Sequence, residues 1–258
     1  TKLSDISIPY PSLTDQQKTI SIINNSFKLI NKAKSNAEKN LTNAKELFAS
    51  HLQNLFMQKN WEEKGLNEIY DVRDGTHDSP KYQEKGYPLV TSKNLKNDDI
   101  DFSNVNFISE KDYIAINKRS KVDKGDVLFA MIGTIGNPVV VEKEPEFAIK
   151  NVALFKVPKN QNSYFLKYYL DSKYVVDKMT RESKGTTQKF VGLGYLRDFR
   201  INIPPIKEQE IIVEKLDALS KETKKLESIY KKEIESLEEL KKSILEKAFN
   251  GELKVEKP

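Results

Sequence analysis

The chain has 258 residues, of which 43 are lysine or arginine and 38 are aspartate or glutamate, with two histidines and no cysteine. This composition is typical of a soluble globular protein, and it excludes a disulfide scaffold, a thiolate zinc site and a cysteine nucleophile. The longest uncharged apolar stretch, residues 127–141, is shorter than the roughly 20 residues of a membrane-spanning helix, so we expect a cytoplasmic protein without membrane contact.

An internal repeat organises the chain into a helix, a middle region and a second helix. Residues 3–56 and 196–249 align without a gap, and 14 of the 54 pairs are identical. In each copy, prolines lead into a polar, acidic start of the kind that begins helices. No glycine or proline follows until Gly65 or Gly251. The repeat therefore predicts long helices over residues 14–59 and 204–250, each about 40–45 residues or roughly 60–68 Å.

Apolar residues recur at heptad spacing in both predicted helices, which favours a coiled coil. The expected helix seam or partner interface contains Ile23, Phe27, Ile30, Leu41, Leu216, Leu219, Leu226, Tyr230, Leu237, Leu240 and Ile244. His51 falls on the same seam, where we expect it to serve in packing. The small residues Ala37 and Ala44 suit an antiparallel or a staggered pairing, and the pattern alone leaves this choice open.

The middle region, residues 60–203, predicts a separate α+β domain. Runs rich in valine, isoleucine, phenylalanine and tyrosine alternate with glycine, proline and Asn-Asp clusters. They favour strands at residues 87–91, 106–108, 126–132, 138–141 and 151–156. One helix is expected over residues 164–180. The predicted fold class is thus α+β, with one mixed domain flanked by two long helices related by the repeat.

Positive charge is concentrated in residues 143–203, which carry 12 basic and 6 acidic side chains. A local basic patch of this kind is typical of a protein with an anionic partner, most commonly nucleic acid. A solvated, lysine-rich surface explains the charge equally well. The polar residues of the loops must therefore distinguish the two interpretations.

DNA binding needs cations that hold phosphates and forked polar groups that reach base edges. Residues 183–189 place both kinds in one predicted loop, and further loop clusters supply the same groups. The candidate DNA-binding residues are Thr76, His77, Lys81, Tyr82, Ser92, Lys93, Asn94, Thr134, Lys184, Thr186, Thr187, Gln188 and Lys189. The alternative is a set of solvated loops in which Gly75 and Gly185 serve only turn geometry.

Catalytic motifs are weak in this chain. Residues 202–205 are similar to the Asn-Pro-Pro-aromatic motif of amino-methyltransferases, but Ile203 interrupts the motif and a helix start explains it better. The Glu146–Lys150 spacing lacks the second acid of a nuclease metal site. His51 and His77 are too few for a histidine metal cluster, and residues 133–136 lack the Lys-Ser/Thr of a phosphate loop. We therefore expect no catalytic residue and no metal site.

Three groups of motifs resemble the target-recognition domain of specificity subunits from Type I restriction–modification systems. They are residues 74–82 with 87–95, residues 124–129 with 133–136, and residues 185–189 with 203–209. Their order and spacing cover nearly the whole chain. Intact subunits of that family usually carry two recognition domains and two long helices. With one domain, this chain is either a half-length subunit or a fragment, in which residues 1–13 look like the tail of a preceding domain and residues 251–258 form a C-terminal tail.

The resemblance implies a non-catalytic subunit that reads one half of a bipartite target in double-stranded DNA. Its helices would act as a spacer and as a docking surface for methyltransferase subunits. Those partners would carry S-adenosylmethionine and methylate adenine, while a separate restriction and motor subunit would cut, so the chain itself needs no cofactor. A half-length subunit would dimerise to restore twofold symmetry. The alternative is a coiled-coil scaffold whose domain binds protein, which salt-dependent DNA binding would exclude.

Overall fold

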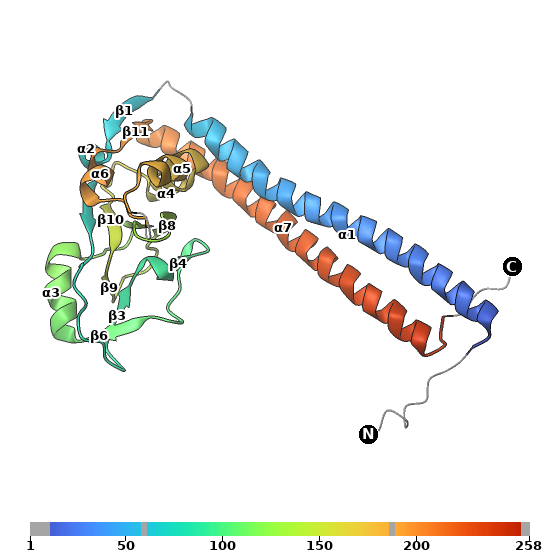
Figure 1. Ribbon diagram of the computed structural model, residues 1–258. Helices are drawn as coiled ribbons and strands as arrows, with labels where there is room; N and C mark the ends of the chain where they lie inside the picture. Colours follow the sequence, from blue (N-terminus) through green and yellow to red (C-terminus); the bar gives the residue numbers. More distant parts are fainter. Residues whose placement is uncertain (1–10, 58–60, 186–188, 254–258) are drawn as a thin grey trace. The chain divides into compact units, whose positions relative to one another are not determined.

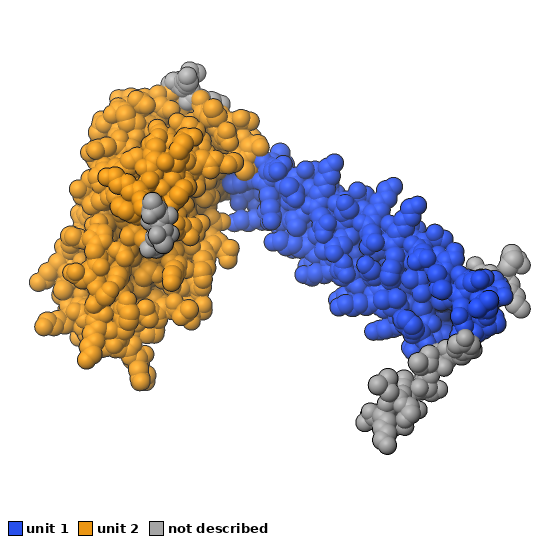
Figure 2. Space-filling model, in the orientation of Figure 1, with its two compact units in different colours: residues 1–48, 219–258 blue, residues 49–218 orange. Residues whose placement is uncertain are grey.

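The computed structural model describes residues 11–57, 61–185 and 189–253. The chain divides into two compact units, shown in different colours in Figure 2. One unit combines residues 1–48 with residues 219–258, and the other comprises residues 49–218. We call them the helix unit and the globular unit.

Two long helices, α1 (Leu13–Phe56) and α7 (Ile206–Phe249), have 44 residues each and confirm the predicted lengths (Figure 1). Both begin just after proline, and Ser12 accepts a hydrogen bond from the backbone N–H of Asp15 in the first turn of α1. Residues 13–48 and 219–249 of these helices make up the helix unit. No helix in the part of the chain that the structure describes is both long and apolar enough to cross a membrane.

The helices of the helix unit pair in antiparallel fashion. The Lys34 ammonium lies 2.5 Å from the Glu238 carboxylate, and the Lys241 ammonium lies 5.1 Å from the centre of the Phe27 ring. The contacting residue numbers thus decrease along α1 as they increase along α7. Hydrogen bonding and charge attraction across this pair raise the pKa of Lys34 and lower the pKa of Glu238. The open choice between pairings is settled in favour of the antiparallel one.

The seam between the helices differs in part from the predicted one. Buried or half-buried side chains at Ile23, Phe27, Ile30, Leu41, Leu219, Tyr230, Leu237 and Ile244 lie along it. Leu226 and Leu240 are 37% and 48% exposed, so they lie outside this seam. Ile234 and Lys241 are half-buried instead, each four residues after the seam residues Tyr230 and Leu237. The apolar stripe of α7 is wider than one partner helix covers, and sequence alone does not say which edge is covered.

The described residues of the globular unit form four small sheets. A two-stranded sheet pairs β1 (Glu62–Gly65) with β11 (Arg200–Ile203). The largest sheet is antiparallel and has the order β2 (Asp71–Asp74), β10 (Val152–Lys156), β7 (Val127–Ala130) and β8 (Gly136–Val140). A third sheet has the order β6 (Asn106–Ile108), β3 (Tyr87–Val90) and β9 (Ala148–Ile149). The fourth pairs β4 (Leu95–Lys96) with β5 (Asp99–Ile100). All five predicted strands are present, and each end agrees with the prediction to within two residues.

Short helices surround these sheets. They are α2 (Leu66–Ile69), the 3₁₀ turn η2 (Ser92–Asn94), α3 (Glu110–Ser120), α4 (Ser163–Asp171), α5 (Lys173–Glu182) and α6 (Leu193–Asp198). The single helix expected over residues 164–180 is wrong, because the chain breaks at Ser172 into α4 and α5. Ser172 is fully buried with extended backbone angles, and its hydroxyl donates to the Tyr169 carbonyl.

The ends of both long helices that belong to the globular unit pack into its core. Phe56, at the end of α1, makes edge contacts with Phe165 and Tyr169 of α4. At the start of α7, buried Gln209 accepts a hydrogen bond from the backbone of Asn162 and donates one to the Pro204 carbonyl. Aromatic packing and a satisfied buried amide thus fix the boundaries of this unit.

Candidate nucleic-acid interface

His77 stands at the centre of the first predicted cluster, in the loop after β2. Its Nε2 atom lies 2.8 Å from the buried carboxylate of Asp74, and its Nδ1 atom lies 2.9 Å from the side chain of Asn151. Thr76 is joined to Lys150 by a β-bridge, and its N–H donates to the Ile149 carbonyl at 3.0 Å. The ring stays 58% exposed. The segment from Ile149 to Asn151 therefore holds this loop in position.

The second cluster, at η2, shares an anchor with the first. The Ser92 hydroxyl donates to the backbone carbonyl of Asn151, the same residue whose side chain contacts His77. Lys93 is exposed beside it. Asn151 has a φ of 54°, in the left-handed region that asparagine tolerates better than most residues. One residue immediately before β10 thus connects both loops.

Asn94 is not available for DNA, contrary to our expectation. It is 5% exposed, and its side-chain oxygen accepts hydrogen bonds from the N–H and the hydroxyl of Thr91. Its side-chain nitrogen donates to the carbonyls of Asp101 and Asn104. The amide is fully used in holding the loop, since a buried amide with unmade bonds would be costly.

The third cluster lies beside the turn between β7 and β8. Lys184 pairs with Phe190 through two backbone hydrogen bonds of 3.0 and 2.9 Å. The Gly133 N–H donates to the Lys189 carbonyl, which places exposed Lys189 next to exposed Thr134. β7 and β8 form an antiparallel hairpin, and Gly133 in its turn has a φ of 80°. The predictions for Thr186, Thr187 and Gln188 lie outside the described residues.

A polar groove joins the second and third clusters. It has a volume of about 620 Å³ and is lined by Thr91, Ser92, Lys93, Lys96, Asn104, Asn106, Thr134 and Asn137 among others. Together with the Asn151 anchor, it makes a continuous surface from His77 through Ser92 to Thr134 and Lys189. Lys81 and Tyr82 are exposed in the loop before β3, and their side chains form no hydrogen bond or ion pair with a described residue of this surface.

The free positive charge of this surface comes from three lysines. Lys93, Lys184 and Lys189 are exposed and form no ion pair with any described residue. Lys96 is 3.1 Å from Asp101. Hydrogen bonds from Ser103, and then from Lys96, lower the pKa of Asp101 to about 2. The three unpaired ammonium groups are therefore available to an anionic ligand.

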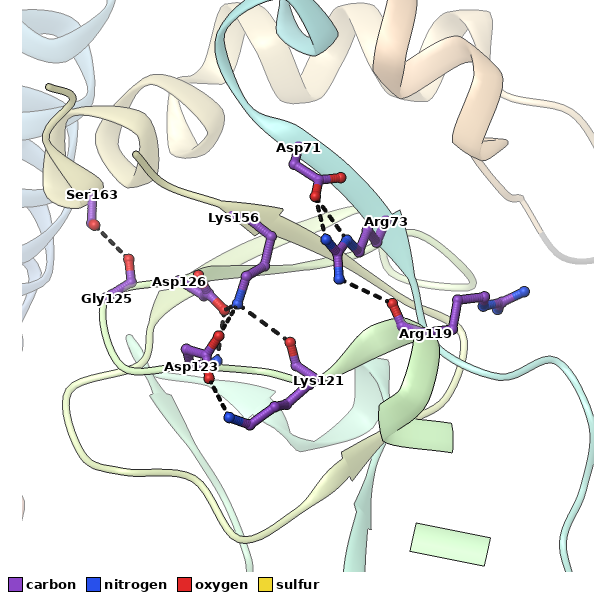
Figure 3. Close-up of polar contacts among 9 residues, drawn as sticks. All are labelled: Asp71, Arg73, Arg119, Lys121, Asp123, Gly125, Asp126, Lys156 and Ser163. Atoms are coloured by element: carbon purple, nitrogen blue, oxygen red, sulfur yellow. Dashed lines mark hydrogen bonds and ion pairs between the residues drawn. The ribbon is translucent and has the colours of Figure 1, made fainter. Parts of the chain in front are cut away.

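A separate group of charges anchors the turn before β7 (Figure 3). The Lys156 ammonium of β10 lies 2.6 Å from the Asp123 carboxylate and 2.5 Å from the Asp126 carboxylate. Burial raises the pKa of Asp126, whereas the hydrogen bond from Lys156 lowers the pKa of Asp123. The Lys-Gly-Asp motif at residues 124–126 thus belongs to a structural ion-pair network, and its acids keep anions away.

Arg119 and Asn151 help to hold the His77 loop, and the sequence did not reveal either of them. The Arg119 guanidinium lies 3.1 Å from the Asp74 carboxylate and 2.8 Å from the Gly75 carbonyl, and it points away from the Lys156 network in Figure 3. Asp74, three residues before His77, was visible in the sequence as a local partner. Asn151 is distant along the chain, and no local pattern connects it to His77.

Acidic and histidine side chains do not gather into a metal site in the described ranges 11–57, 61–185 and 189–253. Asp74 and His77 are in contact, but their other polar partners are Arg119 and Asn151. The arrangement offers hydrogen-bond donors and positive charge at a surface. It is suited to binding a polar anion.

Comparison with known proteins identifies the family of this arrangement. A family model described as the Type I restriction modification DNA specificity domain matches residues 58–236, more than half of the chain. The Type I restriction enzyme MjaVIII specificity subunit of Methanocaldococcus jannaschii is 25% identical over 97% of this chain and 63% of its own length. The EcoBI specificity subunit of Escherichia coli is 25% identical over 77% of this chain and 43% of its own length. The chain thus spans about half of these curated relatives.

Solved structures share the fold. A chain from a study titled "Structural basis underlying complex assembly and conformational transition of the type I R-M system" aligns with a TM-score of 0.78 and 20% identity. The alignment covers 98% of this chain and 67% of that one. The crystal structure of the HsdS subunit from Thermoanaerobacter tengcongensis gives a TM-score of 0.63 at 19% identity, over 95% of this chain and 61% of that one.

Proposed function

Because the chain belongs to the family of Type I restriction modification DNA specificity domains, we propose that it recognises one half of a bipartite target in double-stranded DNA. The observation that carries this proposal is the continuous surface from His77 to Lys189. Its unpaired lysines suit phosphates, and its hydroxyl and amide groups suit base edges. Two of its loops share one anchor, since Asn151 contacts both His77 and Ser92.

The direct test is DNA binding at several salt concentrations. Removal of a phosphate contact weakens binding on every sequence and reduces the salt slope by about one. Lys189→Ala should behave in this way, whereas removal of a base contact should cost about 1–3 kcal/mol on the cognate site only. Lys173→Ala is the matched control, because Lys173 is engaged with Asp177 in α5. Equal binding of parent and Lys189→Ala at all salt concentrations would contradict this assignment.

We further propose that the helix unit is a spacer and a docking surface for methyltransferase subunits. Leu226, Ile229 and Leu240 support this proposal, because they are 37–48% exposed on α7 while the other edge of the stripe is covered. Single exposed apolar residues are ordinary, but three on one long helix favour a partner. S-adenosylmethionine would bind to that partner, and a separate restriction and motor subunit would cut. The chain alone should then transfer no methyl group, and methyl incorporation without any partner would refute this assignment.

If the chain is a half-length subunit, it can regain twofold symmetry by forming a homodimer. On this proposal the target is palindromic, since both halves would be read by identical domains. Sedimentation of the full chain gives its mass, and methylome sequencing of cells carrying the system gives the target. A monomer that methylates an asymmetric target with its partner subunits would contradict the homodimer. A protein-binding scaffold, the alternative, would show no salt-dependent affinity for DNA.

A further inference from the structure

The groove between η2 and the β7–β8 turn is unusual in its chemistry. Three exposed amides line it, from Asn104, Asn106 and Asn137, together with the Thr134 hydroxyl and the Lys93 ammonium. No carboxylate lies among the described lining residues. The hollow beside α3 differs, because its lining includes the carboxylates of Asp78 and Asp112.

Asn106 presents a free amide on a strand of the sheet. It lies in β6, the edge strand of its sheet, opposite Leu89 of β3, and its side chain has no hydrogen-bond partner among the described residues. Asparagine is depleted in strands, where β-branched and aromatic residues pack better. The fold therefore gains nothing from an amide here, and both polar atoms face the groove or water.

Asn137 and Asn94 show the contrast with amides that serve the fold. Asn137 has a φ of 48°, and its side-chain nitrogen donates to the Leu95 carbonyl at 3.1 Å. Its side-chain oxygen has no partner among the described residues and remains an acceptor. Asn94, as shown above, has no polar atom left. Hydrogen bonds among the described residues thus hold both polar atoms of the Asn94 amide, one polar atom of the Asn137 amide and neither polar atom of the Asn106 amide.

We propose that this groove is a base-reading site in which Asn106 recognises adenine and Asn137 supplies a fixed acceptor. An unengaged amide can accept from adenine N6 while donating to N7, which is the pairing that asparagine makes in the major groove. The Asn137 oxygen suits the amino group of adenine or cytosine. Lys93, at the rim, holds a phosphate. This inference rests on the proposed function and specifies which side chains give it sequence selectivity.

The experiment presents a pool of random-sequence DNA duplexes to the full chain, alone and together with the methyltransferase subunit of its own system. Bound sequences are read for the parent, Asn106→Ala, Asn106→Thr and Lys93→Ala. The Asn106→Thr variant keeps a residue with strong β propensity, so it separates recognition from folding. Asn160→Ala is the matched control, since Asn160 is an exposed amide outside the groove lining.

Both Asn106 variants should lose preference for adenine at one position of the motif by about 5- to 150-fold, while other positions persist. Lys93→Ala should weaken binding to all sequences alike and leave the motif unchanged. An unaltered motif in both Asn106 variants would overturn the inference while the proposed function stands. If the parent selects no DNA sequence in either arm, the proposed function and the inference fall together.

Discussion

Gly75 gives the sharpest test of how the recognition loops are held. A Cβ atom at this position would lie 2.3 Å from the Ile149 carbonyl oxygen and 2.8 Å from the Lys150 nitrogen, both backbone atoms. Ordinary contact begins at 3.4 Å, so the two segments must separate by 3.4 − 2.3 = 1.1 Å. That movement would break the 3.0 Å hydrogen bond from the Thr76 N–H to the same oxygen.

Gly75→Ala should therefore destabilise the globular unit by about 2–4 kcal/mol, from overpacking and one lost buried hydrogen bond. For a unit of this size, the melting temperature should fall by about 5–15 °C. Trp61, the only tryptophan, lies in this unit and reports its unfolding by fluorescence. Gly194→Ala is the control, because nothing lies within 4 Å of its Cβ and alanine favours helix α6. Equal melting of parent and Gly75→Ala would refute the argument.

Three further substitutions test the charge networks by the same fluorescence or by circular dichroism. Lys156→Met should cost about 3 kcal/mol, since it leaves the buried Asp126 carboxylate without a cation, and Asp126→Asn added to it should recover part of this loss. Lys34→Glu should weaken the helix unit, and the further change Glu238→Lys should restore its stability. Pairing raises the pKa of Lys34 and lowers that of Glu238. The stabilisation from this ion pair in the parent should therefore fade as pH rises past 10.5 or falls below 4.5. Since the folded-state pKa of Asp101 lies near 2, its contribution should be complete above about pH 4 and lost as pH falls toward 2, and Asp101→Asn should flatten unfolding curves in that interval.

The long helices and the strands could be predicted because their signals are local. The absence of glycine and proline over more than 40 residues has one structural explanation, and the 44-residue helices follow from it. The break at Ser172 was missed because it depends on burial of the residue and on its bond to Tyr169. Leu226 and Leu240 were misplaced because a broad apolar stripe has two edges, and only the partner helix decides which is covered.

The candidate site was predicted less completely, for a related reason. Residue type determines which hydrogen bonds a side chain can form. Its neighbours in the fold determine which of its polar atoms remain free to bind a ligand. Asn94 and Asn106 carry the same amide. One is saturated by Thr91, Asp101 and Asn104, and the other is free on an edge strand. Asn151, which anchors both His77 and Ser92, has a role that arises only when β10 is placed beside the loops.

This division between saturated and free polar groups bears on how target choice could change in such a protein. Asn104, Asn106 and Thr134 are exposed and outside the core, so substitutions there should change stability by no more than about 0.5 kcal/mol. A change at Gly75 or Lys156 instead breaks backbone or ion-pair contacts beneath the surface. On the proposed function, the groove can therefore acquire new base contacts without new compensation in the fold. Stability and selectivity then reside in different residues of the globular unit, and each can be altered while the other is held constant.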